Sequence, residues 1–353
     1  MKSTFNESER GYIVLSEKKY EKSQVAFTVK RIASLISDKN VNGSVIGVMT
    51  ENPVLCMAAV NGISCSGNSA YIMNPNDGAY FNEYVKSKKS IDIVLYDEEI
   101  LQNTEMSEIV SNGILIENDV QGVGEESIEL EAKISIVPDS TFLDVKLPSL
   151  SEEGILAWKN FNQDTIKVSL AKRVILYSKE EAFYPFYWMD FLLSECQIEA
   201  YDVTGKSQTE ILEILRNRNE STCCMSASLL KSLEYHLISL KDVASIFTSL
   251  ITYGNDVYDF LSLKDYLKSN KIRWYNYFGN EYFQMVSTIK KLEDEKLYQA
   301  GKEIKGCRLA VKNAAGVPMP LGVPGIVYAQ NDAYQNANEW KTYLQGKEQK
   351  MVY

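Results

Sequence analysis

The chain has 353 residues, 45% of them apolar, and its 47 acidic residues outnumber 37 basic ones to give a net charge of −10. A chain of this length and apolar content can bury the core of one large domain or of two smaller ones. The acidic balance, with no cluster of Lys and Arg along any stretch, argues against a nucleic-acid partner.

The first third of the chain alternates between helix-like and strand-like segments. Apolar residues recur at helical spacing in QVAFTVKRIASLIS (24–37) and PVLCMAAVNGISC (53–65). Short β-prone runs occur as SVIGVMT (44–50), NSAYIMNP (68–75), IDIVLYD (91–97) and NGILIEN (112–118). Strands separated by helices predict a mostly parallel sheet with helices on its faces.

The same alternation returns in the second half. Strands are expected at residues 172–178, 197–203 and 222–226, and helices at residues 186–195, 209–219 and 227–237. The segment between the two halves, residues 124–154, is acidic and irregular and reads as a connection. Residues 306–330 contain short β-prone runs split by Gly and Pro, which suits a small twisted sheet or a partial barrel.

The sequence thus predicts an α/β fold of two layered subdomains with mostly parallel sheets plus a small C-terminal β subdomain. The expected boundaries are residues 1–150, 151–300 and 301–353, the last part including a polar tail. No apolar run approaches the ~18 residues of a membrane-spanning helix, and the N-terminal segment has no hydrophobic signal core. We therefore expect a cytoplasmic protein without a membrane partner.

Cysteine and histidine usage argues against redox and metal chemistry. The cysteines have no C-x-x-C spacing and mostly lie in apolar segments, so buried reduced thiols are expected. The six are Cys56, Cys65, Cys196, Cys223, Cys224 and Cys307. The single histidine, His236, cannot form a histidine metal cluster, and no metal site is expected.

The order of six short segments resembles the large N-terminal part of the adenylate-forming ligases, and is most similar to the adenylation domains of nonribosomal peptide synthetases. STCCMSASLLKSL (221–233) resembles the family's strand and P-S-L-L helix start, with Ala227 where Pro is usual. SLITYGNDVY (249–258) is similar to the strand that ends in G-G-E, with Tyr253, Gly254 and Asn255 in its place. The remaining matches are residues 44–76, IDIVLYDEEIL (91–101), YNYFGNEYF (275–283) and PLGVPGIVY (320–328).

The resemblance implies an enzyme that joins ATP to a carboxylate, releases pyrophosphate and passes the acyl group to a thiol. This chemistry needs donors around the triphosphate, a carboxylate-held Mg²⁺ and a cation near the α-phosphate. The family's phosphate loop is expected just before residues 172–178. That stretch, FNQDTIKVSLA (161–171), has no Gly and only one Thr, Thr165, and cannot present consecutive backbone amides to phosphates.

The stretch YNYFGNEYF resembles the family's N-x-Y-G-x-T-E. Asn276, Phe278 and Gly279 keep the turn and an aromatic face, Glu281 replaces the Thr, and Tyr282 replaces the Mg²⁺-binding Glu. A phenol is a poor ligand for a hard cation at neutral pH. A one-residue deletion would return Glu281 to the metal, but the Thr would still be missing.

Two further family features are not found. The Y-x-T-G-D segment and the mobile C-terminal domain with the catalytic Lys have no counterpart in this sequence, and Ala182 falls opposite the family's amino-acid-selecting Asp. We therefore expect no catalytic residues and no productive binding of ATP or Mg²⁺. The residues left of a vestigial nucleotide or substrate cleft are Tyr253, Gly254, Asn255, Asn276, Phe278, Gly279, Glu281, Tyr282 and Ala182.

Three functions stay open. The leading hypothesis is a catalytically inactive scaffold or docking partner for a carrier protein, an active ligase or another assembly-line component. The second is a small-ligand module that binds a nucleotide or carboxylate through Tyr253, Asn255, Phe278 and Tyr282. The third is half of a split acyl-adenylating ligase. The aromatic cluster at residues 182–191 is either a partner surface or a core helix.

Overall fold

The computed structural model of the protein describes residues 12–15, 18–116, 149–150, 172–178, 197–217, 221–240, 246–254, 260–278, 288–291, 302–303, 307–313, 315–320, 323, 326–331 and 334–335. The chain divides into two compact units, Met1–Lys159 with Ser178–Ile198, and Asn160–Tyr177 with Glu199–Tyr353. The three-part division expected at residues 150 and 300 stays a prediction. The α/β architecture with mostly parallel sheets is confirmed.

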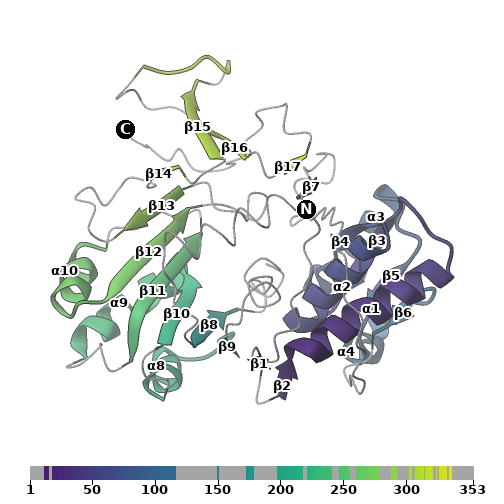
Figure 1. Ribbon diagram of the computed structural model, residues 1–353, viewed down its shortest axis with the longest axis horizontal. Helices are drawn as coiled ribbons and strands as arrows, with labels where there is room; N and C mark the ends of the chain where they lie inside the picture. The colour runs from purple at the N-terminus through teal and green to yellow at the C-terminus, as the bar shows by residue number, and fades with distance from the viewer. Residues whose placement is uncertain are drawn as a thin grey trace. The chain divides into compact units, whose positions relative to one another are not determined.

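The first unit contains a parallel four-stranded sheet in the order β4-β3-β5-β6 (Figure 1). Its strands are β3 (Val45–Met49), β4 (Ser69–Ile72), β5 (Val94–Tyr96) and β6 (Ile114–Leu115). Its helices are α1 (Lys22–Asp38), α2 (Pro53–Cys65), η1 (Pro75–Asp77), α3 (Ala79–Lys88), α4 (Glu98–Gln102) and α5 (Thr104–Ser107). An antiparallel hairpin, β1 (Tyr12–Leu15) and β2 (Lys18–Glu21), precedes α1.

Helix α2 is buried along nearly its whole length, because it packs against α1 as well as against β3 and β4. This explains why its sequence is apolar all round instead of carrying one apolar stripe. Asn52 begins the helix, since its side-chain oxygen accepts the N–H groups of Val54 at 3.0 Å and Leu55 at 3.2 Å. Gly62 permits the close approach of α1, because a Cβ there would lie 2.6 Å from Cγ2 of Ile32.

The second unit is built on a larger sheet in which strands run in the order β14-β13-β12-β11-β10-β8-β9 (Figure 1). Strands β8, β10, β11 and β12 are parallel, and β13 and β14 continue the sheet in antiparallel pairs. The bounds are β8 (Arg173–Tyr177), β9 (Gln197–Asp202), β10 (Ser221–Ser226), β11 (Phe247–Gly254), β12 (Arg273–Phe278), β13 (Thr288–Lys291) and β14 (Lys302–Glu303). The helices are α8 (Gln208–Arg216), α9 (Ala227–Ser239) and α10 (Leu261–Ser269).

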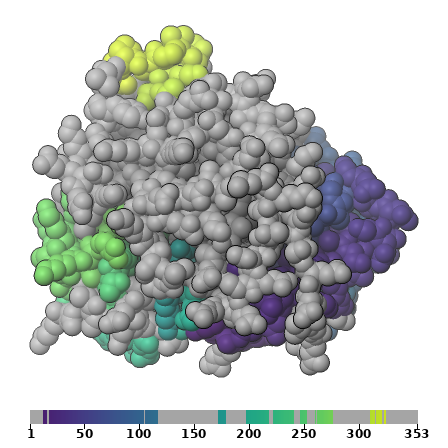
Figure 2. All heavy atoms as spheres, viewed as in Figure 1, coloured from purple at the N-terminus to yellow at the C-terminus, as the bar shows by residue number. Residues whose placement is uncertain are grey.

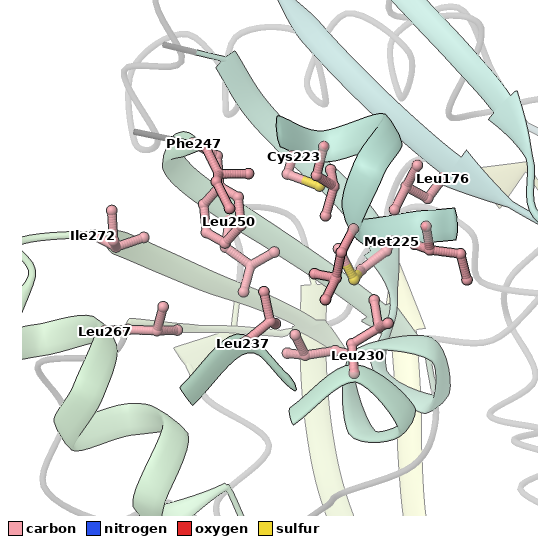
Figure 3. Close-up of a cluster of buried hydrophobic side chains, with 14 of the residues drawn as sticks. Leu176, Cys223, Met225, Leu230, Leu237, Phe247, Leu250, Leu267 and Ile272 are labelled. Atoms are coloured by element: carbon pink, nitrogen blue, oxygen red, sulfur yellow. The ribbon is translucent and has the colours of Figure 1, made fainter. Parts of the chain in front are cut away.

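One face of this sheet forms the main core of the second unit, shown in Figure 3. Alternate residues of the strands, such as Cys223 and Met225 of β10, meet Leu230 and Leu237 of α9. The buried leucines of α9 recur at the helical spacing that the sequence shows, and all are completely shielded from solvent. The sheet is therefore held rigidly from one side, which fixes the strand ends discussed below.

A separate antiparallel pair consists of β15 (Cys307–Lys312) and β16 (Ile326–Asn331). It agrees with the small β-rich segment expected near the C-terminus. The described part of the turn between these strands includes exposed apolar side chains, Val317 and Val323. With the end of β15 it forms the yellow group of atoms in Figure 2. Two short strands, β7 (Ser149–Leu150) and β17 (Tyr334–Gln335), complete the described strands.

The predicted element types agree with the structure wherever it describes them. The helix expected at residues 53–65 has those same bounds as α2, and the other predicted helices and strands that the structure describes differ from it by up to three residues at an end. The helix expected at residues 186–195, the aromatic cluster at 182–191 and most of the connection at 124–154 lie outside the described residues.

Candidate functional site

The carboxyl ends of β10, β11 and β12 lie level with one another. The register pairs Ser226 of β10 with Tyr253 of β11, and Tyr253 with Tyr277 of β12. One residue further along, Gly254 pairs with Phe278. In open parallel sheets, ligands bind in the space outside such strand ends. This carboxyl edge is therefore the candidate site.

The fold brings together residues that are distant in the sequence. Tyr253 and Gly254 from one of the resembling segments lie on the strand next to Asn276 and Phe278 from another. Thr252, which pairs with Asn276, was missed in the sequence analysis. The only signal for it was its place just before Tyr253 at the end of a β-prone run. The cleft residues Asn255, Gly279, Glu281, Tyr282 and Ala182 lie outside the described residues.

Thr252 and Trp274 stiffen the site from within the core. The indole Nε1 of Trp274 donates to Oγ1 of Thr252 at 2.9 Å, and Thr252 is fully buried. The ring of Trp274 also meets the ring of Phe260 edge-on, with centroids 5.1 Å apart. Because Trp274 and Thr252 lie on adjacent parallel strands, their hydrogen bond fixes the register of β11 against β12 just before the strands end.

Helix α9 begins directly at this edge. Oγ of Ser226 accepts the N–H of Leu229 at 3.3 Å and lies 3.0 Å from Oγ of Ser228. Ala227 occupies the first helical position and is buried. The positive end of the dipole of α9 therefore lies beside Tyr253, and the hydroxyl groups of Ser226 and Ser228 are hydrogen-bonded to each other there.

The described part of the edge is uncharged. Its positions are residues 225–228 of β10 and α9, 252–254 of β11 and 276–278 of β12, and none of them is Asp, Glu, Lys, Arg or His. By residue type, this set contains aromatic rings and neutral hydrogen-bonding groups. It supplies neither a carboxylate for Mg²⁺ nor a cation for a phosphoryl oxygen. Among the described residues of the whole chain, no group of three His, Cys, Asp or Glu side chains could hold a metal ion.

In the first unit, polar side chains also lie at the carboxyl ends of neighbouring strands, and the sequence did not single them out. Thr50 follows β3 and Asp97 follows the neighbouring strand β5, so the parallel sheet places them together. The Thr50 hydroxyl donates to Oδ2 of the fully buried Asp97, and Oδ1 of Asp97 accepts the N–H of Ile100 at 3.1 Å. Their positions immediately after two apolar strands were the signal that could have found them.

The neighbouring polar groups are also paired internally. The N–H of Asn52 donates to Oγ1 of Thr50 at 3.0 Å, and Nδ2 of Asn52 donates to the hydroxyl of Tyr20 at 3.0 Å. Because these groups already have partners, the network serves to fix the start of α2 and α4. Burial, and then the charge of Asp97, raise the pKa of the Cys56 thiol to about 12.

At the level of sequence, no family model and no curated protein matches the chain. Comparison of the structures is decisive. o-Succinylbenzoate CoA synthetase (MenE) from Bacillus subtilis, in complex with ATP and magnesium ion, matches with a TM-score of 0.71 and 13% identity over 94% of this chain and 70% of its own. The chain has the fold of the adenylate-forming ligases.

Two more ligases give the same result. The AMPPNP-bound nonribosomal peptide synthetase FmoA3 matches with a TM-score of 0.74 and 15% identity, over 94% of this chain and 37% of its own. ATP-bound MatB from Rhodopseudomonas palustris matches with a TM-score of 0.72 and 12% identity, over 93% and 69%. The resemblance in the sequence is thus confirmed as a relationship of fold. No helix in the described part of the chain is long and apolar enough to cross a membrane.

Proposed function

We propose that this protein is a catalytically inactive protein with the adenylate-forming ligase fold, which acts as a scaffold or docking partner in a nonribosomal-peptide-type or acyl-activating pathway. The observation that carries the proposal is the uncharged edge at residues 225–228, 252–254 and 276–278. The solved ligases with this fold include ones bound to ATP with magnesium ion or to AMPPNP. In this chain the described carboxyl ends of β10, β11 and β12 provide no charged group for such a ligand.

The sequence before β8 supports the same conclusion. Residues 161–171 lack the glycines that let successive backbone amides surround a phosphate. Loss of one group that stabilises a transition state typically costs ~10²–10³-fold in rate. Loss of the phosphate loop together with the metal carboxylate reduces adenylation below a useful rate even when the two effects are not additive.

An adenylation assay tests the inactivity directly. The whole chain is incubated with ATP, Mg²⁺ and a panel of carboxylic and amino acids, and pyrophosphate release is followed, with MenE from Bacillus subtilis as the active control. We expect release at the background rate. Formation of an acyl-adenylate by this chain alone would refute the proposal.

A second assay tests the docking role. The chain is mixed with carrier proteins and active ligases encoded near its gene, and complexes are detected by size-exclusion chromatography with light scattering. A defined complex that leaves the partner active supports the scaffold. If pyrophosphate is released only in the mixture, the chain is instead half of a split ligase. If it binds none of these partners, the docking role is wrong.

The aromatic strand ends favour one second candidate, a module that binds a nucleotide or a carboxylate without reacting. Tyr253 and Tyr277 occupy paired positions on adjacent strands beside the start of α9. Thermal-shift measurements with AMP, ATP and simple acids, each with and without Mg²⁺, test this. We expect AMP to raise the Tm independently of Mg²⁺ and the shift to be lost in Tyr253→Ala. Tyr235→Ala, which removes a 79% exposed ring of α9, is the matched control. Unchanged melting curves with every ligand would eliminate this candidate.

A further inference from the structure

The chain contains three Asn-Gly pairs, Asn42–Gly43, Asn61–Gly62 and Asn112–Gly113. At such a pair the backbone nitrogen of Gly can attack the side-chain carbonyl carbon of the preceding Asn, because Gly has no Cβ to hinder the approach and turns freely. The three pairs share this local chemistry. Their surroundings in the folded chain therefore decide which of them reacts.

Asn42 and Gly43 lie in the loop between α1 and β3, and both are exposed. Gly43 has φ of +67°, and an added Cβ there would meet no atom within 4 Å. Among the described residues, no hydrogen bond holds the N–H of Gly43 or the side chain of Asn42. The nucleophile and the carbonyl carbon are therefore free to rotate toward each other.

The flanking residues of this loop are held firmly by a single side chain. Oδ1 of Asn68 accepts the N–H of Ser44 at 3.0 Å, and Nδ2 of Asn68 donates to the carbonyl oxygen of Val41 at 3.0 Å. Asn68 itself is buried. The reactive pair is thus the unrestrained centre of a loop whose two ends are fixed.

The other two pairs are blocked in different ways. Asn61 is 1% exposed inside helix α2, where its Nδ2 donates to the carbonyl oxygen of Met57 at 2.8 Å. Asn112 is exposed, but the N–H of Gly113 is engaged with the carbonyl oxygen of Val110 at 2.7 Å. A Cβ on Gly113 would lie 2.3 Å from the carbonyl oxygen of Val94, which shows how closely this backbone is packed. Attack at either pair requires local unfolding.

We propose that Asn42 is a site of spontaneous deamidation and main-chain isomerisation in the folded protein. The Gly43 nitrogen forms a bond to Cγ of Asn42, the bond from Cγ to the side-chain nitrogen breaks, and ammonia leaves with the proton of the attacking N–H. Water then opens the cyclic imide at one of its two carbonyl carbons. The products are an aspartate or an isoaspartate, and no oxidant or reductant is needed.

The change would alter this loop in two respects. Each product adds one negative charge, and the isoaspartate also adds a methylene group to the main chain between Val41 and Ser44. Because Asn68 holds both of these residues, we expect the longer main chain to strain its two hydrogen bonds. The modification is independent of the function proposed above.

The test compares the three pairs within one protein. The whole folded chain is incubated in mildly alkaline buffer, and the conversion of amide to acid is followed by peptide mass spectrometry. We expect Asn42 to react at least about tenfold faster than Asn61 and Asn112, for which a barrier difference of about 1.4 kcal/mol suffices. In urea the three rates should become similar. Equal rates in the folded chain, or no reaction at Asn42 while it reacts in urea, would overturn the proposal.

Two variants separate the chemistry from a change in folding. Gly43→Ala places a side chain on the attacking residue and should slow the reaction at Asn42 by about tenfold or more. Gly205→Ala introduces similar backbone strain elsewhere, since Gly205 has φ of +71° and equally open surroundings. It should leave the rate at Asn42 unchanged. If Gly43→Ala reacts as fast as Gly205→Ala, attack by the Gly43 nitrogen is not the route.

Discussion

Trp274 of β12 donates its indole N–H to the hydroxyl of Thr252 of β11, at 2.9 Å and within the core of the second unit. This hydrogen bond ties together the two strands whose ends form the candidate site. Thr252→Val removes the acceptor and leaves a buried N–H without a partner. We expect a loss of about 1–3 kcal/mol in the free energy of unfolding, measured in urea.

Thr209→Val is the matched control for this prediction. Thr209 is exposed in the first turn of α8, where a surface substitution changes stability by about 0.5 kcal/mol or less. Equal stability of the two variants would contradict the structural role of the Trp274–Thr252 bond.

Asp97 provides a second prediction, because its carboxylate is fully buried and bonded to both the Thr50 hydroxyl and the N–H of Ile100. Asp97→Ala removes the cap of α4 and leaves the Thr50 hydroxyl without its acceptor. The expected loss is about 1–3 kcal/mol for the unpaired group and about 1 kcal/mol more for the cap. Asp92→Ala, at an exposed position before β5, should be nearly neutral in the same unfolding measurement.

The third prediction concerns acid stability and the start of α8. Hydrogen bonds from the hydroxyl and the backbone N–H of Ser207, at 2.6 and 2.8 Å, hold the pKa of Glu210 below its usual value of 4.5. A lowered folded-state pKa contributes stability that is present above pH 4.5 and is lost as the pH falls through the folded pKa.

We therefore expect Glu210→Gln to lose less stability than the parent chain on acidification below pH 4.5. Urea unfolding at a series of pH values measures this difference. Glu213→Gln removes a charge from the same helix outside the Ser207 contact and should follow the parent. If the free energy of unfolding falls equally for Glu210→Gln and for the parent chain below pH 4.5, the Ser207 contact is absent in solution.

Cysteine reactivity gives the fourth prediction. Burial raises the pKa of Cys65 to about 12, and burial followed by the Asp97 charge does the same for Cys56. At pH 8 only roughly one part in ten thousand of each thiol is then ionised, and thiolate is the form that reacts. Iodoacetamide should leave both residues unmodified in the folded chain and label both in urea. Rapid labelling of either one without denaturant would contradict the full burial of Cys56 or the partial burial of Cys65.

Much of the fold could be predicted because its signals are local. The apolar run after Pro53 specifies α2, and alternating helix and strand segments specify a parallel sheet. The expectation of buried free thiols was confirmed for Cys56, Cys223 and Cys224, whereas Cys65 is only half-buried. The helix expected at residues 227–237 was confirmed as α9. The order of such segments predicted the fold shared with the adenylate-forming ligases, which match this chain in structure at only 12–15% identity.

Only the tertiary structure decided how residues far apart in the chain meet. Strand register places Tyr253 beside Tyr277, sheet order places Thr50 beside Asp97, and packing leaves one of three Asn-Gly pairs open. These outcomes depend on hydrogen bonds and contacts between distant segments, which the local periodicity of a sequence does not encode. The sequence by itself determined the kinds of element and their order, whereas the partners of individual side chains came from long-range packing.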